Sequence, residues 1–393
     1  MNPFELTPEH ETFRKSVREF ALGEIAPHAA QWDRDHHFPT DVVAKMGDLG
    51  LFGLTAPEEY GGAGLRGEDG GFTSLCIAIE ELGRVDQSMA ITFEAAVRLG
   101  ITPLLEYGTD EQKQTWLPDL VAGRALAGFG LTEAGAGSDA SATKTRAVLD
   151  NGEWVINGSK QFITNSGSSI TSLVTVTART GEVDGKAELS TIIVPADTAG
   201  FIAEKAYDKL GWHASDTHPL SFDDARVPED HLLGERGRGY AQFLATLDDG
   251  RVAISALSVG CIQACLEMAV TYAGERQTFG GPIGRKQGVA FQIADLEVML
   301  HASRMLTYRA AALKDRRAPM KEFKQAAAVA KLYTTESAVT ATRIATQVFG
   351  GYGFMEEYPV ARFYRDAKVL EIGEGTSEVQ RMLIARGLGL PVE

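Results

Sequence analysis

The spacing of hydrophobic residues along the chain changes twice. Over residues 1 to about 125 the spacing is helical, and Phe13, Val17 and Phe20 fall on one face of a predicted helix. The pair Pro39-Thr40 predicts the start of another helix, and glycine clusters such as residues 60–64 interrupt the pattern. The first third of the chain is therefore predicted to be a set of helices joined by glycine-rich loops.

From about residue 126 to 235 the pattern becomes that of short β-strands. Asn151-Gly152 is a two-residue turn signal in front of the strand-like run at Trp154. Runs rich in β-branched residues follow at 172–178, 190–195 and 219–228. Short strands separated by turns favour a small antiparallel barrel or sandwich over a parallel sheet.

From about residue 236 helical spacing returns, now in long segments. Val289, Ile293, Leu296 and Leu300 are spaced to form one buried helical face. Several long helices with short connections favour a bundle. The predicted fold is mainly α with a central β domain: a helical domain at 1–126, a β-barrel domain at 127–236 and a helical bundle domain at 237–393.

The composition is that of a globular protein, and its charge narrows the possible partners. The 393 residues are 44% hydrophobic and carry a net charge of −15. A nucleic acid or an anionic membrane requires a basic face on the protein, so neither is an expected partner. The eight histidines show no ligand spacing, so no metal site is expected.

Several features of the sequence predict a reduced, cytoplasmic location. The low and odd count of cysteines (Cys76, Cys261 and Cys265) argues against a disulfide framework, and the last two lie on an apolar stretch typical of core packing. Residues 1–13 are acidic and lack the apolar run of a targeting peptide. No segment is expected to reach the roughly 20 apolar residues of a membrane span.

The glycine-rich segment 131–139 is the first candidate for ligand binding. Its backbone N–H groups and hydroxyls suit a phosphate or the edge of a flavin ring. It superficially resembles a dinucleotide fingerprint, but β-type sequence rather than a helix follows it, so no βαβ unit is expected. On local sequence alone, a plain hairpin loop and a ligand-binding loop are equally good interpretations.

Three further segments each allow a functional and a purely structural interpretation. Phe162 and Thr164 could stack on a planar heterocycle and hydrogen-bond to it, although a single Phe is more often part of a core. Arg276, at a predicted helix end, either complements the helix dipole or binds a pyrophosphate. Gly350-Gly351 is either a helix C-cap or a place where a ligand approaches the backbone closely.

Glu374 is an isolated carboxylate framed by Gly373 and Gly375. Ser377 and Gln380 fit a capping box, so a helix is predicted to begin directly after it. Glu374 is then either a pre-helical acid favoured by the helix dipole or, if it is desolvated, a general base with a raised pKa.

In combination these motifs resemble those of the acyl-CoA dehydrogenases, over essentially the whole chain. The motifs are LTEAGAGSDA (131–140), NGSKQFITNS (157–166), ERQTFGGPI (275–283), QVFGGYGF (347–354) and IGEGTSEVQR (372–381). The resemblance implies a C-terminal four-helix bundle, FAD held between the barrel and the bundle, and a homotetramer built as a dimer of dimers.

The resemblance also implies which residues contact the cofactor. Those expected to contact FAD in the same subunit are Phe129, Leu131, Thr132, Gly137, Ser138, Phe162, Ile163, Thr164, Thr376, Ser377 and Glu378. Those that match contacts to the FAD of a neighbouring subunit are Arg276, Gln287, Gln347, Val348, Gly350 and Gly351, and Phe279 is assigned to the cofactor site with them.

The implied reaction is α,β-dehydrogenation of an acyl-CoA thioester to trans-2-enoyl-CoA. Glu374 matches the base that removes the pro-R α-proton while a hydride leaves the β-carbon for flavin N5, near which Thr164 would hydrogen-bond. The backbone N–H of Glu374 and a ribityl hydroxyl would polarise the thioester oxygen, each stabilising the transition state by about 3 kcal/mol. An electron-transferring flavoprotein would accept the electrons. Positions that match acyl-CoA contacts are Ser138, Asp248, Arg251 and Gly375.

The chain departs from the common family pattern at three positions. Gly373 replaces a Tyr, which removes an aromatic wall from the acyl pocket and leaves the chain length open. Phe162 replaces a Trp beside the flavin. Some relatives carry the base on a bundle helix just before an Arg; that position here is Gly250, ahead of Arg251, so Glu374 is the sole matched base.

The leading hypothesis is a short- to medium-chain or branched-chain acyl-CoA dehydrogenase, of fatty acid β-oxidation or branched-chain amino acid catabolism. A flavin oxidase or monooxygenase on the same fold is one alternative, which slow reoxidation of the flavin in air would disfavour. A non-catalytic binding relative, including DNA-binding ones, is another; the net charge of −15 disfavours it, and a colourless purified protein would favour it.

Overall fold

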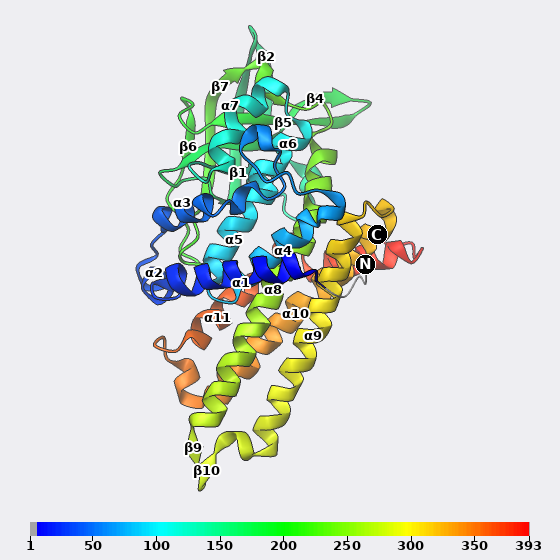
Figure 1. Cartoon of the computed structure of the whole chain (residues 1–393). Coiled ribbons are helices and arrows are strands. Elements are labelled where there is room, and N and C mark those ends of the chain that lie inside the picture. The colour runs from blue at the N-terminus through cyan, green and yellow to red at the C-terminus, as the bar shows by residue number, and fades with distance from the viewer. Residues whose placement is uncertain (1–5, 393) are drawn as a thin grey trace.

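The computed structural model describes residues 6–392 and confirms a mainly α fold with a central β domain. Residues 1–5 of the acidic N-terminal stretch, which was predicted not to be a targeting peptide, lie outside the described residues. Figure 1 shows the β domain at one end of the molecule and long helices extending from it to the other end. The predicted limits at residues 126 and 236 stay predictions.

The N-terminal segment is helical, as predicted. Helix α3 begins at Thr40, and Val17 is fully buried in the face of α1 that carries Phe13 and Phe20. The helices are α1 (Pro8–Phe20), α2 (Ala29–Asp35), α3 (Thr40–Asp48), α4 (Gly71–Gly83), α5 (Gln87–Ala95), α6 (Thr102–Tyr107) and α7 (Asp110–Val121). A π-helical segment, Ala96–Ile101, joins α5 to α6.

The central domain is an eight-stranded sheet in which β-strands pair in the order β6-β7-β3-β2-β4-β5-β8, with β1 beside β4. Asn151 and Gly152 both have positive φ, as the predicted two-residue turn between β2 and β3 requires. The strands are β1 (Leu126–Gly130), β2 (Arg146–Asp150), β3 (Glu153–Thr164), β4 (Thr171–Val183), β5 (Lys186–Pro195), β6 (Phe201–Ala203), β7 (Thr217–Pro228) and β8 (Leu232–Leu233).

The expectation of a wholly antiparallel sheet was wrong for two strand pairs. Strand β1 pairs with β4 in parallel, and β2 contributes one further parallel pairing with β4. Parallel strands require a long connection, and residues 131–170 provide it between β1 and β4. Because β1 pairs with β4 and not with β2, the glycine-rich segment after β1 is not a hairpin loop.

The C-terminal segment is a bundle of long helices that also crosses the N-terminal helices. Its helices are α8 (Gly239–Glu275), α9 (Gln287–Asp315), α10 (Met320–Phe349), α11 (Pro359–Ala367) and α12 (Ser377–Gly387). A short hairpin of β9 (Gln277–Thr278) and β10 (Gly281–Pro282) closes the end of the bundle opposite to the β domain (Figure 1). The predicted inward face of α9 is confirmed, since Leu296 and Leu300 are buried and Val289 and Ile293 pack against the core.

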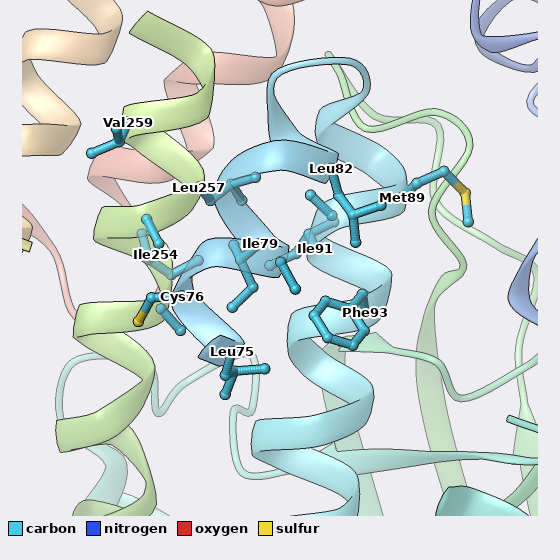
Figure 2. Close-up of a cluster of buried hydrophobic side chains, with 14 of the residues drawn as sticks. Leu75, Cys76, Ile79, Leu82, Met89, Ile91, Phe93, Ile254, Leu257 and Val259 are labelled. Carbon is cyan, nitrogen blue, oxygen red and sulfur yellow. The ribbon is translucent and has the colours of Figure 1, made fainter. Parts of the chain in front are cut away.

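The main hydrophobic core joins the N-terminal helices to the bundle. Figure 2 shows side chains of α4 and α5, among them Leu82 and Phe93, packed close to Ile254 and Leu257 of α8. Gly83 permits this close crossing, because a Cβ there would lie 2.7 Å from Leu257 Cδ1. Cys76, Cys261 and Cys265 are buried as free thiols, which confirms the core role predicted for the last two.

The prediction that no segment is apolar enough for a membrane span was wrong. Two helical stretches, Gln87–Tyr107 and Gly239–Glu275, meet the length and hydropathy required of a span. Their apolar windows are 89% and 78% buried inside the fold, so other helices surround them. They are apolar on nearly every side because they lie inside the main hydrophobic core, where a helix has no face in contact with solvent.

Candidate active site

Glu374 lies in the short connection between the 3₁₀ turn Lys368–Glu371 and helix α12. The helix begins where it was predicted, but the predicted capping box was wrong by one residue. Thr376, which has an extended backbone, is the N-cap, and its hydroxyl accepts a hydrogen bond from the Val379 N–H at 3.4 Å. Ser377 is instead the first helical residue, and its buried Oγ has no hydrogen-bond partner.

The backbone at Glu374 and Gly375 is left-handed, with φ of +54° and +88°. A residue other than glycine or asparagine rarely adopts this conformation, which costs of the order of 1–3 kcal/mol where it must be held. Gln380, which was predicted to cap the helix, donates from Nε2 to the carbonyl oxygens of Glu374 and Gly375 at 3.2 and 2.9 Å. The backbone at the candidate base is therefore strained, and the hydrogen bonds from Gln380 hold it in this conformation.

The side chain of Glu374 reaches across to helix α8 and packs on Gly250. A Cβ added at Gly250 would lie 2.5 Å from Glu374 Oε2 and 2.9 Å from Cδ. The carboxyl group therefore occupies the space that a side chain at position 250 would fill. Positions 250 and 374, the two places where relatives carry the base, therefore meet in the fold. A side chain at position 250 would collide with the carboxyl group of Glu374.

The carboxyl group of Glu374 is desolvated at its tip. The residue as a whole is half-buried, but Oε2 has no contact with solvent and no hydrogen-bond partner. Burial raises the pKa of Glu374 to about 7, against the opposing attraction of Arg251, Lys331 and Arg98. An acid placed only to complement the helix dipole would have a lowered pKa, so the environment favours the interpretation of Glu374 as a base.

A second buried carboxyl group, Glu94 of α5, lies within electrostatic reach of Glu374. Both of its oxygens are buried without partners, and burial, together with the negative charge of Glu374, raises its pKa well above the usual range. One turn further on, Arg98 forms a buried ion pair with Asp249 of α8. Sequence reasoning missed this group, although charged residues in a helix as apolar as α5 and its extension were a visible signal.

Two of the predicted acyl-CoA contacts form a buried ion pair beside Gly250. Arg251 pairs with Asp248, whose other oxygen forms an ion pair with Lys324 Nζ at 3.0 Å. Lys331 donates to the carbonyl oxygen of Gly375 at 2.7 Å. The structure thus brings Asp248, Arg251, Glu374 and Gly375 together, whereas Ser138 is exposed on the loop after β1 and its contact with a substrate stays a prediction.

The glycine-rich loop and strand β3 form one continuous surface. The Gln161 N–H donates to the Thr132 carbonyl at 2.8 Å, and buried Lys160 donates to the carbonyl of Leu131 and to the carboxylate of Glu133. Phe129 packs against Phe243 of α8 with the two rings tilted by 35° and their centroids 4.0 Å apart, which joins this surface to the helix that carries Gly250.

This surface fits a flat heterocycle with a polar edge. Phe162 is 65% exposed at a positive φ of 62°, so the interpretation of Phe162 as a core residue was wrong. Ile163 is buried beneath the sheet, and Thr164 ends the strand half-buried. Open space surrounds Gly137 on this surface. Thr376, Ser377 and Glu378 lie on a separate element, at the start of α12, where the buried Oγ of Ser377 has no hydrogen-bond partner; their contacts with FAD stay predictions. These features are those expected of a flavin site.

The remaining predicted cofactor residues lie elsewhere, at the far end of the bundle. Arg276 directly follows α8, and Gly350 ends α10 with φ of +61°. Arg276, Val348, Gly350 and Gly351 line a cavity of about 570 Å³ with Tyr272 and Tyr352. Gln347 and Gln287 are exposed, and Phe279 in the hairpin is 94% exposed. Twenty-six helical positions separate Gly250 from Arg276, which corresponds to roughly 40 Å.

Comparison with known families identifies the family to which this chain belongs. Three family models match: acyl-CoA dehydrogenase N-terminal domain over residues 7–124, middle domain over 128–225 and C-terminal domain over 237–389. The chain belongs to the acyl-CoA dehydrogenase family. It is an acyl-CoA dehydrogenase and an FAD-dependent flavoprotein.

Individual relatives cover nearly the whole enzyme. It is 47% identical to probable acyl-CoA dehydrogenase YngJ of Bacillus subtilis (98% of this chain, 99% of that one) and 42% identical to the mitochondrial short-chain specific acyl-CoA dehydrogenase of Bos taurus (97% and 90%). Among solved structures, butyryl-CoA dehydrogenase from Megasphaera elsdenii matches with a TM-score of 0.92 and 38% identity (98% and 99%).

Two further structures are informative about cofactor and partner. An acyl-CoA dehydrogenase complexed with FAD from Bacillus anthracis matches with a TM-score of 0.90 and 32% identity, over 99% of this chain and 68% of that one. A chain from a study of the electron transferring flavoprotein of Acidaminococcus fermentans matches with a TM-score of 0.92 and 39% identity, over 98% and 99%.

Proposed function

We propose that the enzyme converts a short-chain acyl-CoA to trans-2-enoyl-CoA, with Glu374 as the base. The observation that carries this proposal is the buried, unpartnered carboxyl of Glu374 held against Gly250. The α-C–H bond breaks, its proton passes to Glu374, and its electron pair forms the new C=C bond. When bound, FAD supplies the two-electron acceptor for the hydride from the β-carbon.

The environment of Glu374 suits proton removal from carbon. A carboxylate in water is too weak a base for an α-C–H group, but burial has raised the pKa of Glu374 to about 7 and so makes it a stronger base at neutral pH. The proposed donor to the thioester oxygen is the backbone N–H of Glu374 itself. Asp248, Arg251 and Gly375 would then contact the thioester-bearing arm of CoA beside it.

The preference for a short acyl chain rests on the relatives, two of which are named short-chain specific and butyryl-CoA dehydrogenases. Position 373 gives no bulky side chain to limit the pocket, since Gly373 has open space around it apart from a Val369 carbonyl at 3.6 Å. We expect a straight C4 or C5 acyl group to be preferred, with branched groups of similar size accepted more slowly.

Anaerobic bleaching of the flavin by a panel of straight, branched and aromatic acyl-CoAs tests both activity and substrate class. Butyryl-CoA is expected to bleach the flavin fastest. A holoenzyme that no saturated acyl-CoA bleaches would contradict the proposed reaction. We further propose an electron-transferring flavoprotein as the acceptor, as the Acidaminococcus fermentans match suggests; rapid reoxidation by air in its absence would instead indicate an oxidase.

The pH dependence of kcat/KM is expected to follow the ionisation of Glu374. Only the carboxylate accepts a proton, so kcat/KM should rise with pH and level off above about pH 7. The rates of butyryl-CoA turnover at constant ionic strength measure this profile. A profile that is flat between about pH 5.5 and 8 would mean that Glu374 is not the titrating base.

We also propose that the second group of predicted cofactor residues serves the FAD of a neighbouring subunit, in a homotetramer arranged as a dimer of dimers. The distance of roughly 40 Å along α8 is too long for one FAD to touch both Arg276 and the residues around Glu374 within one chain. Sedimentation of the holoenzyme as a single 42.3 kDa chain would contradict this arrangement. A cytoplasmic location remains a prediction, with which the three free thiols agree.

A further inference from the structure

The backbone that carries the base is held by two side chains to which the proposed reaction gives no role. Lys331 and Gln380 are both fully buried, although each is a polar residue of a type usually found at the surface. Lys331 comes from the middle of α10 and Gln380 from the first turn of α12. Both direct their nitrogen atoms at the Glu374–Gly375 backbone.

The carbonyl oxygen of Gly375 is the focus of this arrangement. It accepts from Lys331 Nζ at 2.7 Å and from Gln380 Nε2 at 2.9 Å, which uses both of its lone pairs. The same amide nitrogen of Gln380 also donates to the Glu374 carbonyl at 3.2 Å. The directions of the carbonyl groups of Glu374 and Gly375 are therefore fixed.

These hydrogen bonds are made to the part of the backbone that has an unfavourable conformation. Glu374 has a φ of +54°, which the chain adopts only when its surroundings impose it. Gly375 must be glycine, since its φ is +88° and a Cβ would lie 2.8 Å from Gln380 Nε2. The side chain of Glu374 and its N–H share one Cα, so the backbone rotation at this residue sets the direction of both.

We propose that Lys331 and Gln380 are positioning residues, which hold the Glu374–Gly375 backbone so that the carboxylate and the N–H of Glu374 face the substrate together. The inference rests on the proposed function of Glu374 as base. Both residues act through the backbone and through Glu374, and neither is expected to touch the acyl group.

The charge of Lys331 adds an electrostatic contribution to this role. Burial lowers the pKa of Lys331 to about 8, while Glu374, Glu371 and Glu336 favour its charged form and Arg251 opposes it. Around Glu374 itself, burial disfavours the carboxylate, while Arg251, Lys331 and Arg98 favour it. The neighbouring Glu94 has its own pKa raised well above the usual range, by burial and by the charge of Glu374. Removal of the Lys331 charge is therefore expected to raise the pKa of the base.

The test is Lys331→Met, with Lys321→Met as the matched control because Lys321 is an exposed lysine at the start of the same helix. Lys331→Met is expected to keep FAD and to bind butyryl-CoA about as tightly as the wild type. Its rate constant for anaerobic flavin reduction should fall about 10- to 100-fold, because the base is misplaced. The midpoint of the pH profile should move to higher pH, and Lys331→Arg should restore the midpoint more fully than the rate.

A second variant separates position from charge. Gln380→Met removes the amide donors without a change of charge, so the rate should fall with the pH midpoint nearly unchanged. Peptide-level hydrogen exchange gives a readout that does not depend on activity: exchange over residues 372–382 should be faster in both variants than in the wild type and in Lys321→Met.

The outcomes distinguish this inference from the proposed function. If butyryl-CoA and the rest of the acyl-CoA panel fail to bleach the wild-type flavin, the proposed function fails. If the wild type is bleached and folded Lys331→Met and Gln380→Met are bleached at the same rate, the positioning role is overturned while the function stands. Should Lys331→Met not fold, Gln380→Met decides, since a wild-type rate in that variant is sufficient to overturn the role.

Discussion

Glu374→Gln is expected to retain FAD and to lose about 10³- to 10⁴-fold in the rate of anaerobic flavin reduction by butyryl-CoA. Gln keeps the size and polarity of the side chain, so it still fits against Gly250. It cannot accept a proton from carbon, and Gly250, the alternative position for a base, carries no side chain. Stopped-flow absorbance of the flavin at saturating substrate measures the rate.

The same substitution is expected to stabilise the folded protein above neutral pH. The pKa of Glu374 is about 7 in the folded state against 4.5 for an ordinary Glu, so the folded state holds a proton that the unfolded state has released. The contribution of this group to the free energy of unfolding therefore falls by a few kcal/mol at most as the pH rises from about 4.5 to 7. It stays at this lower value at higher pH. Gln carries no such penalty.

Thermal unfolding of the holoenzyme at about pH 5 and 8 tests this, since Glu374→Gln should have a higher Tm than the wild type mainly at pH 8. Glu297→Gln, a substitution at an exposed position on α9, is the control and should leave both the flavin reduction rate and the Tm unchanged. A Glu374→Gln enzyme that bleaches at the wild-type rate would remove Glu374 from the mechanism.

Gly250→Ala is the second substitution with a large expected effect. The new Cβ would lie 2.5 Å from Glu374 Oε2, closer than any non-bonded contact allows, so the carboxyl group must move away. A shift of about 1 Å in a reacting group costs on the order of 100-fold in rate, and we expect the flavin reduction rate to fall by that factor. FAD binding should persist, because the predicted flavin contacts lie on other elements.

Gly274→Ala provides a matched control on the same helix. Gly274 is exposed near the end of α8, and a Cβ there would meet nothing within 4 Å. Alanine has the higher helix propensity, so this variant should be active and more stable by up to about 1 kcal/mol. If Gly250→Ala reduced its flavin as fast as Gly274→Ala, the packing of Glu374 on Gly250 would have no bearing on catalysis.

Local sequence predicted most of the secondary structure because each signal acted over short distances. The 3.6-residue spacing of apolar positions in α9 and the start of α3 at Thr40 depend on a few neighbouring residues. The Asn151-Gly152 turn likewise requires only two residues that tolerate positive φ. The parallel pairing of β1 with β4 could not be predicted in this way, since it joins strands separated by the 40 residues 131–170.

Some features of the site likewise depend on neighbouring residues in the sequence, and others depend on residues from distant parts of the chain. The helices and most strands, the family motifs and the match of Glu374 to the base could be read from the residues, because they depend on residue type and spacing along one chain. The fold was needed to show that Glu374 is desolvated, that it packs on Gly250, and that Glu94, Lys331 and Gln380 belong to its surroundings. Burial and charge are set by groups that meet in space, and helices α5, α8, α10 and α12 bring these together from distant parts of the chain.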